Sequence, residues 1–147
     1  MDESEFKKTF RDVNATPCAF AKAILRRCAT CSRAQKLFIA EREAVACKSP
    51  GAHQRCLEVL TQLHNKAMFS LHLHHPEQVL PHGKELKVQC GGLLGLQQAL
   101  NETDHATEVV NDINALLEQA VREHGDLDSL PLGDVVKAIS AFKPRGK

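Results

Sequence analysis

Five of the six cysteines in this 147-residue chain lie in one stretch, between Thr16 and Cys56. The sixth, Cys90, stands apart and is followed by two glycines. The N-terminus is charged and has no apolar run behind it, so it does not resemble a secretory signal. We therefore expect a cytoplasmic protein. In a reducing compartment cysteines seldom form stable disulfides, so this many cysteines indicate metal binding or redox chemistry.

Composition narrows the class of protein. Apolar residues make up 43% of the chain and charged residues 25%, which is typical of a soluble globular protein, and we expect one domain spanning residues 1–147. The 19 Lys and Arg residues nearly balance the 18 Asp and Glu residues, so charge gives no reason to expect binding to nucleic acid or to a membrane. No stretch approaches the roughly 18 apolar residues of a membrane span. Without Trp or Tyr, the chain also lacks the usual stacking residues for single-stranded nucleic acid.

Apolar residues recur at helical spacing along most of the chain and predict an all-α fold, a bundle of about five to seven helices with an irregular segment near residues 72–92. Thr16-Pro17 and Ser49-Pro50 each combine an N-cap residue with a proline suited to the first helical turn. Gly125 suits the position just after a helix. Residues 85–89 alternate and predict a short extended piece. The predicted helices span residues 2–13, 17–27, 32–47, 50 to about 73, 93–100, 104–124 and 131–142.

Helical geometry offers a first arrangement of the cysteines. A helix over residues 17–27 would place Cys18 and Cys28 about 15 Å apart, at a rise of ~1.5 Å per residue, which is too far for both to bind one small centre. If the next helix doubles back, Cys47 returns to the neighbourhood of Cys18. Cys56, near the start of the third helix, lies close by. In this folded-back arrangement Cys18, Cys47 and Cys56 bind the centre, and Cys90 supplies the fourth ligand.

In a second, wrapped arrangement the segment from Thr16 to Cys31 is not a straight helix and encloses one site. The pair Cys28-x2-Cys31 is then a chelating unit, because a turn can direct both thiolates at one metal, and Cys47 or Cys56 joins it in a four-thiolate set. The sequence leaves both arrangements open. The candidate ligands are therefore all six cysteines: Cys18, Cys28, Cys31, Cys47, Cys56 and Cys90.

Two simpler interpretations apply to individual cysteines. Cysteine is a small hydrophobe that is often buried, so Cys56, which is followed by Leu57, could belong to the core. Cys28 and Cys31 also match a dithiol redox pair, although the βαβ context of a thioredoxin-like protein is missing.

The sequence favours an iron–sulfur cluster, in particular a 4Fe–4S cluster, over zinc. Helix N-termini beside cysteines, together with nearby Lys and Arg residues, would offset the negative charge of a thiolate-bound cluster. Ligands scattered over several elements, and six cysteines rather than four, also fit a cluster better than a zinc knuckle. Zinc is the alternative cofactor.

Other candidate residues carry weaker patterns. Glu102-x-x-His105 is half of a di-iron carboxylate motif, and its second half is absent from the sequence. A histidine-rich loop could chelate a transition metal, although a solvated loop is the simpler interpretation. Its members are His72, His74, His75 and His82.

The chain has no nucleophile elbow, phosphate-binding loop or dinucleotide fingerprint, so no pattern in it indicates an enzyme. We expect a small iron–sulfur protein that senses redox state or cluster level, or carries electrons, and that acts with a protein partner. The alternative is a zinc-stabilised helical adaptor that mediates contacts between proteins.

Overall fold

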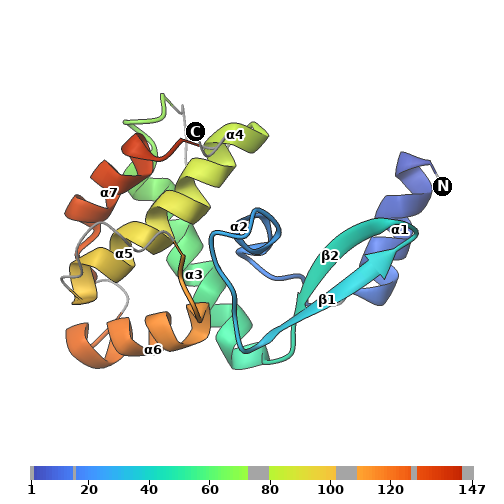
Figure 1. Ribbon diagram of the computed structural model, residues 1–147, viewed down its shortest axis with the longest axis horizontal. Helices are drawn as coiled ribbons and strands as arrows, with labels where there is room; N and C mark the ends of the chain where they lie inside the picture. The colour runs from blue at the N-terminus through green and yellow to red at the C-terminus, as the bar shows by residue number, and fades with distance from the viewer. Residues whose placement is uncertain (1, 15, 73–79, 102–108, 127–128, 144–147) are drawn as a thin grey trace.

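The computed structural model describes residues 2–14, 16–72, 80–101, 109–126 and 129–143. Figure 1 shows a helical body and an arm that projects from it; the arm consists of the N-terminal helix α1 and a two-stranded hairpin. Helix α1 spans Glu3–Val13, strand β1 spans Ala34–Ile39 and strand β2 spans Arg42–Cys47. The elements of the body are α2 (Ala21–Leu25), α3 (Pro50–Ala67), α4 (His82–Leu86), η1 (Lys87–Gly91), α5 (Gly92–Asn101), α6 (Ile113–His124) and α7 (Leu132–Ala141).

The hairpin corrects the all-α prediction, because β1 and β2 occupy the stretch that was predicted as a helix over residues 32–47. The fold is mainly helical with one two-stranded antiparallel sheet, in which Ile39 pairs with Arg42 across a two-residue loop. Ala40 begins this loop with a left-handed φ of 58°. Hairpin loops of this length usually place Gly or Asn at such positions. Their absence hid the turn, and the apolar residues around it matched helical spacing equally well.

Two further predictions are wrong in detail. The helix predicted over residues 17–27 is confined to α2, because Pro17 forms a bridge with Ala46 and extends the chain beside β2. The extended piece predicted over residues 85–89 is helical, since α4, η1 and α5 follow one another without a break. η1 is a π-helical turn, a rare feature that often marks a functional site. Of the predicted irregular segment, residues 73–79 lie outside the described part of the chain.

The remaining helices follow their sequence patterns. Ser49 caps α3 by accepting a hydrogen bond from the Ala52 N–H, and Pro50 occupies the first helical turn, as predicted. α5 and α7 match their predicted ranges closely. α6 spans Ile113–His124 and is followed by Gly125, whose φ is 86°, while residues 104–108 of the predicted helix lie outside the described residues.

The body is closely packed where α7 crosses η1 and α5. A Cβ atom on Gly91 would lie 2.7 Å from the Cα of Ile139, and one on Gly95 would lie 2.7 Å from the Cβ of Ala138. Both glycines lie in helices, Gly91 in η1 and Gly95 in α5. Glycine is needed at these two positions because α7 approaches η1 and α5 too closely for a larger residue.

Candidate metal centre

Four of the six cysteines line one small cavity at the junction of the arm and the body. The four-cysteine cavity, as we call it, is lined by Cys18, Cys31, Cys47 and Cys56, has a volume of about 10 Å³ and has an almost wholly apolar wall. Each cysteine comes from a different segment: the stretch before α2, the turn before β1, the end of β2 and the second turn of α3. The site is therefore a product of tertiary folding.

Backbone hydrogen bonds hold Cys18 and Cys47 side by side. The N–H of Cys18 donates to the carbonyl of Val45 over 2.9 Å, and the N–H of Cys47 donates to the carbonyl of Thr16 over 2.8 Å. The stretch that begins at Thr16 thus pairs with the far edge of β2. The hairpin and this stretch form one extended unit, and two of the four thiols lie at its base.

Cys31 is held by contacts to the start of α6. The N–H of Thr30 donates to the carbonyl of Val110 over 2.9 Å, on one side of Cys31. On the other side, the N–H of Ser32 donates to Oδ1 of Asp112 over 3.0 Å. Asp112 also caps α6. The turn that carries Cys31 is therefore fixed to the body, even though the following strand belongs to the arm.

Cys56 approaches the cavity from α3 and is 8% exposed. Two polar contacts complete the surroundings. Nε2 of His53 donates to the carbonyl of Pro17 over 2.9 Å, which ties α3 to the segment of Cys18. The guanidinium of Arg55 donates to Oδ1 of the buried Asn114 over 2.8 Å, which ties α3 to α6.

Burial and mutual repulsion keep two of the thiols neutral. Burial, followed by the neighbouring Cys18, Cys31 and Cys47, raises the pKa of Cys56 to about 12, while Arg55 opposes the shift. Burial also raises the pKa of Cys18 to about 11, again with contributions from Cys31 and Cys47. The pKa values of Cys18 and Cys56 therefore depend on the charge of the neighbouring cysteines in the cavity. A cation among them would reverse the shift and favour the thiolates.

Backbone groups donate to two of the sulfurs. The N–H of Arg33 donates to Sγ of Cys31 over 3.4 Å, and the backbone of Phe20 forms a hydrogen bond to Cys18 that lowers its pKa slightly against the effect of burial. Cys47 instead donates its own S–H to the carbonyl of Ser49 over 3.3 Å. The backbone N–H groups at Cys31 and Cys18 would stabilise these sulfur atoms if they carried a negative charge.

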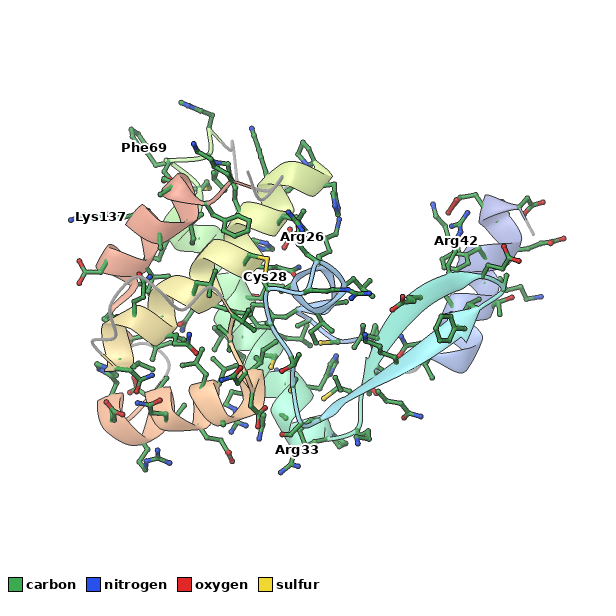
Figure 2. All side chains as sticks on the ribbon, viewed as in Figure 1. Arg26, Cys28, Arg33, Arg42, Phe69 and Lys137 are labelled. Carbon is green, nitrogen blue, oxygen red and sulfur yellow. A yellow bond between two sulfur atoms is a disulfide. The ribbon has the colours of Figure 1, made fainter. Side chains whose placement is uncertain are left out.

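Cys28 and Cys90 lie apart from the cavity and form a disulfide, with Cα atoms 6.1 Å apart and 62 positions between them in sequence. Figure 2 shows this bond between the loop that follows α2 and the helix that contains η1. The disulfide joins the N-terminal part of the body to its central helix. Both residues are buried.

The grouping differs from both predicted arrangements. The folded-back arrangement placed Cys18, Cys47 and Cys56 together, as they are here, but its fourth member was Cys90 rather than Cys31. The wrapped arrangement included Cys31 but paired it with Cys28. The hairpin explains the difference, because it carries Cys47 back to the turn of Cys31 at the register that pairs Ala34 with Cys47.

A single tetrahedral ion would set a strict requirement on the spacing of the four thiols. Among the residues that the structure describes, no group of three or more His, Cys, Asp or Glu side chains is arranged to hold a metal ion as it stands. Tetrahedral zinc with Zn–S bonds near 2.3 Å requires sulfur atoms about 3.8 Å apart. The thiols would therefore have to rearrange to bind a single ion.

The other predicted candidates do not extend this site. Nδ1 of His82 accepts a hydrogen bond from Nζ of Lys22 over 3.0 Å. His74, His75, Glu102 and His105 lie outside the described residues. The sequence did not single out Asp112 or Asn114, which support the cavity from α6. An Asp just before the apolar residues of α6 matches an N-cap, which was the one available signal.

No known protein family, curated protein or solved structure matches this chain. Among the described residues, no helix has both the length and the apolar character needed to cross a membrane.

Proposed function

We propose that this protein binds an iron–sulfur cluster through Cys18, Cys31, Cys47 and Cys56, and that it acts as an electron carrier or as a sensor of redox state or cluster level. One observation carries the proposal: four thiols from four separate segments converge on one apolar cavity. Four neighbouring thiols with no charge partner among them are expected where folding is completed by a bound cation or cluster.

Three features favour a cluster over a single ion. Among the described residues, the four thiols are not arranged to hold a single metal ion as they stand. Backbone N–H groups are directed at Cys18 and Cys31, as hydrogen bonds to sulfur tune and stabilise clusters. The guanidinium-bearing residue Arg33 also lines the cavity, and its charge would offset part of the negative charge of a thiolate-ligated cluster.

Structural zinc is the second candidate, and the size of the cavity favours it. A volume of about 10 Å³ is close to that of one water-sized sphere, so a cluster would have to displace the wall more than an ion would. Zinc would link the hairpin to α3 and stabilise an adaptor that binds another protein.

Metal analysis separates the two candidates. We expect protein purified without oxygen, or reconstituted with iron and sulfide, to contain iron and acid-labile sulfide and to show the visible absorption and EPR signals of a cluster. Protein that holds stoichiometric zinc, and that loses cooperative unfolding when the zinc is chelated, would support the adaptor instead. Protein that binds neither would overturn the proposal.

Substitution identifies the ligands. Alanine at Cys18, Cys31, Cys47 or Cys56 should each abolish stable metal loading, because three thiolates leave the centre open. The control is the double variant C28A/C90A, which removes the two cysteines that lie outside the cavity and should load metal normally wherever circular dichroism shows that it folds. Loss of metal in the control, with retention in all four single variants, would contradict this ligand set.

A protein partner and a reducing compartment belong to the same proposal. An electron carrier needs a redox partner, and a sensor needs a protein to regulate. A disulfide is more common in oxidising compartments, so Cys28–Cys90 is the feature that tests the compartment. Rapid acid quenching of cells followed by differential alkylation would show its state; a fully oxidised pair with four alkylated cavity cysteines would place the protein in an oxidising setting.

A further inference from the structure

Cys31 lines a second space as well as the four-cysteine cavity. A surface groove of about 400 Å³ lies between the loop after α2 and the start of β1, and Cys31 forms part of its wall. Of the four cavity cysteines, Cys31 is the one that lines this groove. We call it the Arg27 groove, after Arg27 at its rim. Cys31 is therefore the cavity cysteine that a solute in this groove would meet.

The groove is cationic. Its charged lining residues are Arg27 and Lys36, and no acidic side chain lines it in the described part of the chain. Lys36 also lies 3.9 Å from Glu43 on the neighbouring strand, but both side chains are about half exposed and the pair is weak. Nonpolar contacts come from Ile24 and Ala34. The space thus fits an organic anion of moderate size.

Arg27 occupies a backbone position where glycine would be more stable. It has a left-handed φ of 71° and directly follows the C-cap of α2. The N–H of Arg27 donates to the carbonyl of Ile24, and the N–H of Cys28 donates to the carbonyl of Ala23, which is the Schellman pattern that usually places glycine at this position. A charged residue held there at a conformational cost indicates a role for its side chain.

We propose that the Arg27 groove binds small carboxylate-bearing disulfides and directs them to Cys31, so that the four-cysteine cavity is oxidised by thiol–disulfide exchange. The Cys31 thiolate attacks one sulfur of the bound disulfide; a Cys31–sulfur bond forms, the disulfide bond breaks, and one small thiolate leaves. This inference uses the same four cysteines as the proposed function but needs no bound metal.

A second exchange closes the reaction inside the cavity. Cys18 or Cys56, both of which line the same cavity as Cys31, releases its proton to the departing small thiolate and then attacks the mixed disulfide at the Cys31 sulfur as a thiolate. An internal disulfide forms and the second small thiol leaves. In total, two cysteine thiols lose two electrons and two protons, and the small disulfide gains them as it becomes two thiols. The oxidised pair can no longer bind a metal as thiolates, so oxidation and metal loading exclude each other.

The test compares two disulfides of opposite charge on the metal-free protein. Glutathione disulfide carries carboxylates, and cystamine carries only ammonium groups. Each is added to the protein with Cys28–Cys90 intact, and early modification is located by mass spectrometry of peptides. A synthetic peptide of residues 26–36, with its Cys28 replaced by serine, gives the intrinsic reactivity of Cys31 towards each reagent. We expect Cys31 to be modified first, with a preference for the anionic reagent about tenfold above that of the peptide.

Three variants connect this preference to the groove. Arg27→Gly removes the charge at a position where glycine relieves the backbone, so the protein should become more stable while the preference falls severalfold. Lys36→Gln should reduce the preference by a smaller factor, and Arg27→Lys should keep most of it. Since the first variant is expected to fold better than the parent, a lost preference cannot be ascribed to unfolding.

Two results would overturn the inference: a preference no greater than that of the peptide, or first modification at Cys18 or Cys47. The metal-loaded protein separates this inference from the proposed function. If metal binds but the anionic preference is absent, only the groove assignment fails. If no metal binds and the preference is present, only the metal assignment fails.

Discussion

Ala40 adopts a left-handed backbone conformation that costs an L-residue roughly 1 kcal/mol or more. Because it begins the two-residue loop of the hairpin, Ala40→Gly should raise the free energy of unfolding by up to about 1 kcal/mol, less the greater entropy of glycine in the unfolded chain. Urea denaturation measures this. The neighbouring Glu41 has no positive φ, so Glu41→Gly is the control and should lower stability. Equal losses from both changes would mean that the loop has another conformation.

Gly91 lies where η1 meets the backbone of α7. Gly91→Ala should destabilise the protein by about 1–3 kcal/mol, because the new methyl group would meet the Cα of Ile139, which cannot rotate away. Gly133 is the matched control: it lies in α7, and a Cβ there meets nothing within 4 Å. Gly133→Ala should stabilise by up to about 1 kcal/mol through helix propensity. Thermal unfolding measures the change in stability of each variant. A change of the same sign in both variants would contradict this packing.

At the scale of elements, the sequence predicts what local chemistry decides. α3 follows from Ser49 and Pro50, and the end of α6 from Gly125, because caps and helix-terminating residues act within a turn. The hairpin was missed because its turn contains neither Gly nor Asn. Its strands are stabilised by contacts with the stretch that begins at Thr16 and with α1, and these contacts leave no local pattern in the sequence of the strands. Tertiary contacts, rather than local sequence preference, therefore make this segment a hairpin instead of a helix.

The disulfide between Cys28 and Cys90 connects two elements of the body across a long loop. Replacing both cysteines by alanine should lower the free energy of unfolding by about 4 kcal/mol or somewhat less, given the loss of a cross-link that closes a loop of this length in the unfolded chain. Denaturation of the parent with and without reductant provides the comparison. If C28A/C90A matches the oxidised parent in stability, the pair does not cross-link the protein in solution.

At the scale of the whole molecule, the sequence predicted that cysteines would converge but not which ones. The folded-back arrangement grouped Cys18, Cys47 and Cys56, which do line one cavity, but from a helical hairpin in place of a β-hairpin, and its helix length separated Cys31 from them. The wrapped arrangement kept Cys31 with Cys47 or Cys56 but added Cys28, which lies outside the cavity. Which thiols meet depends on the register of β1 with β2 and on the contact of Thr30 with Val110, and neither has a local signal.

The buried thiols give the metal-free protein a distinctive dependence on pH. The pKa values of Cys18 and Cys56 are raised in the folded state to about 11 and about 12, from an ordinary value of 9.0. Folding therefore favours the protonated thiols, so this contribution is complete below pH 9 and is lost as the pH rises towards 11 and 12. We expect the metal-free protein to lose on the order of a few kcal/mol across this range, measured by urea denaturation at fixed pH values.

The metal-loaded protein is the comparison, because its ligating sulfurs are already thiolates and have no proton to lose. Its stability should change much less between pH 9 and pH 11. The variant C18A/C56A, without metal, should also show a flatter profile. A steep loss in that variant would assign the effect to other groups, such as the lysines.

The position of the four-cysteine cavity has a mechanical consequence. Cys18 and Cys47 belong to the extended unit at the base of the arm, whereas Cys31 is fixed to α6 and Cys56 to α3 (Figure 1). Anything that ligates all four sulfurs would cross-link the arm to the body at its root, and its release would leave the arm held by hydrogen bonds and by the packing of residues such as Val45 against the core. The flexibility of the arm relative to the body would then depend on whether the four sulfurs are ligated. A protein that binds the arm, far from the cysteines, could distinguish a rigid arm from a flexible one.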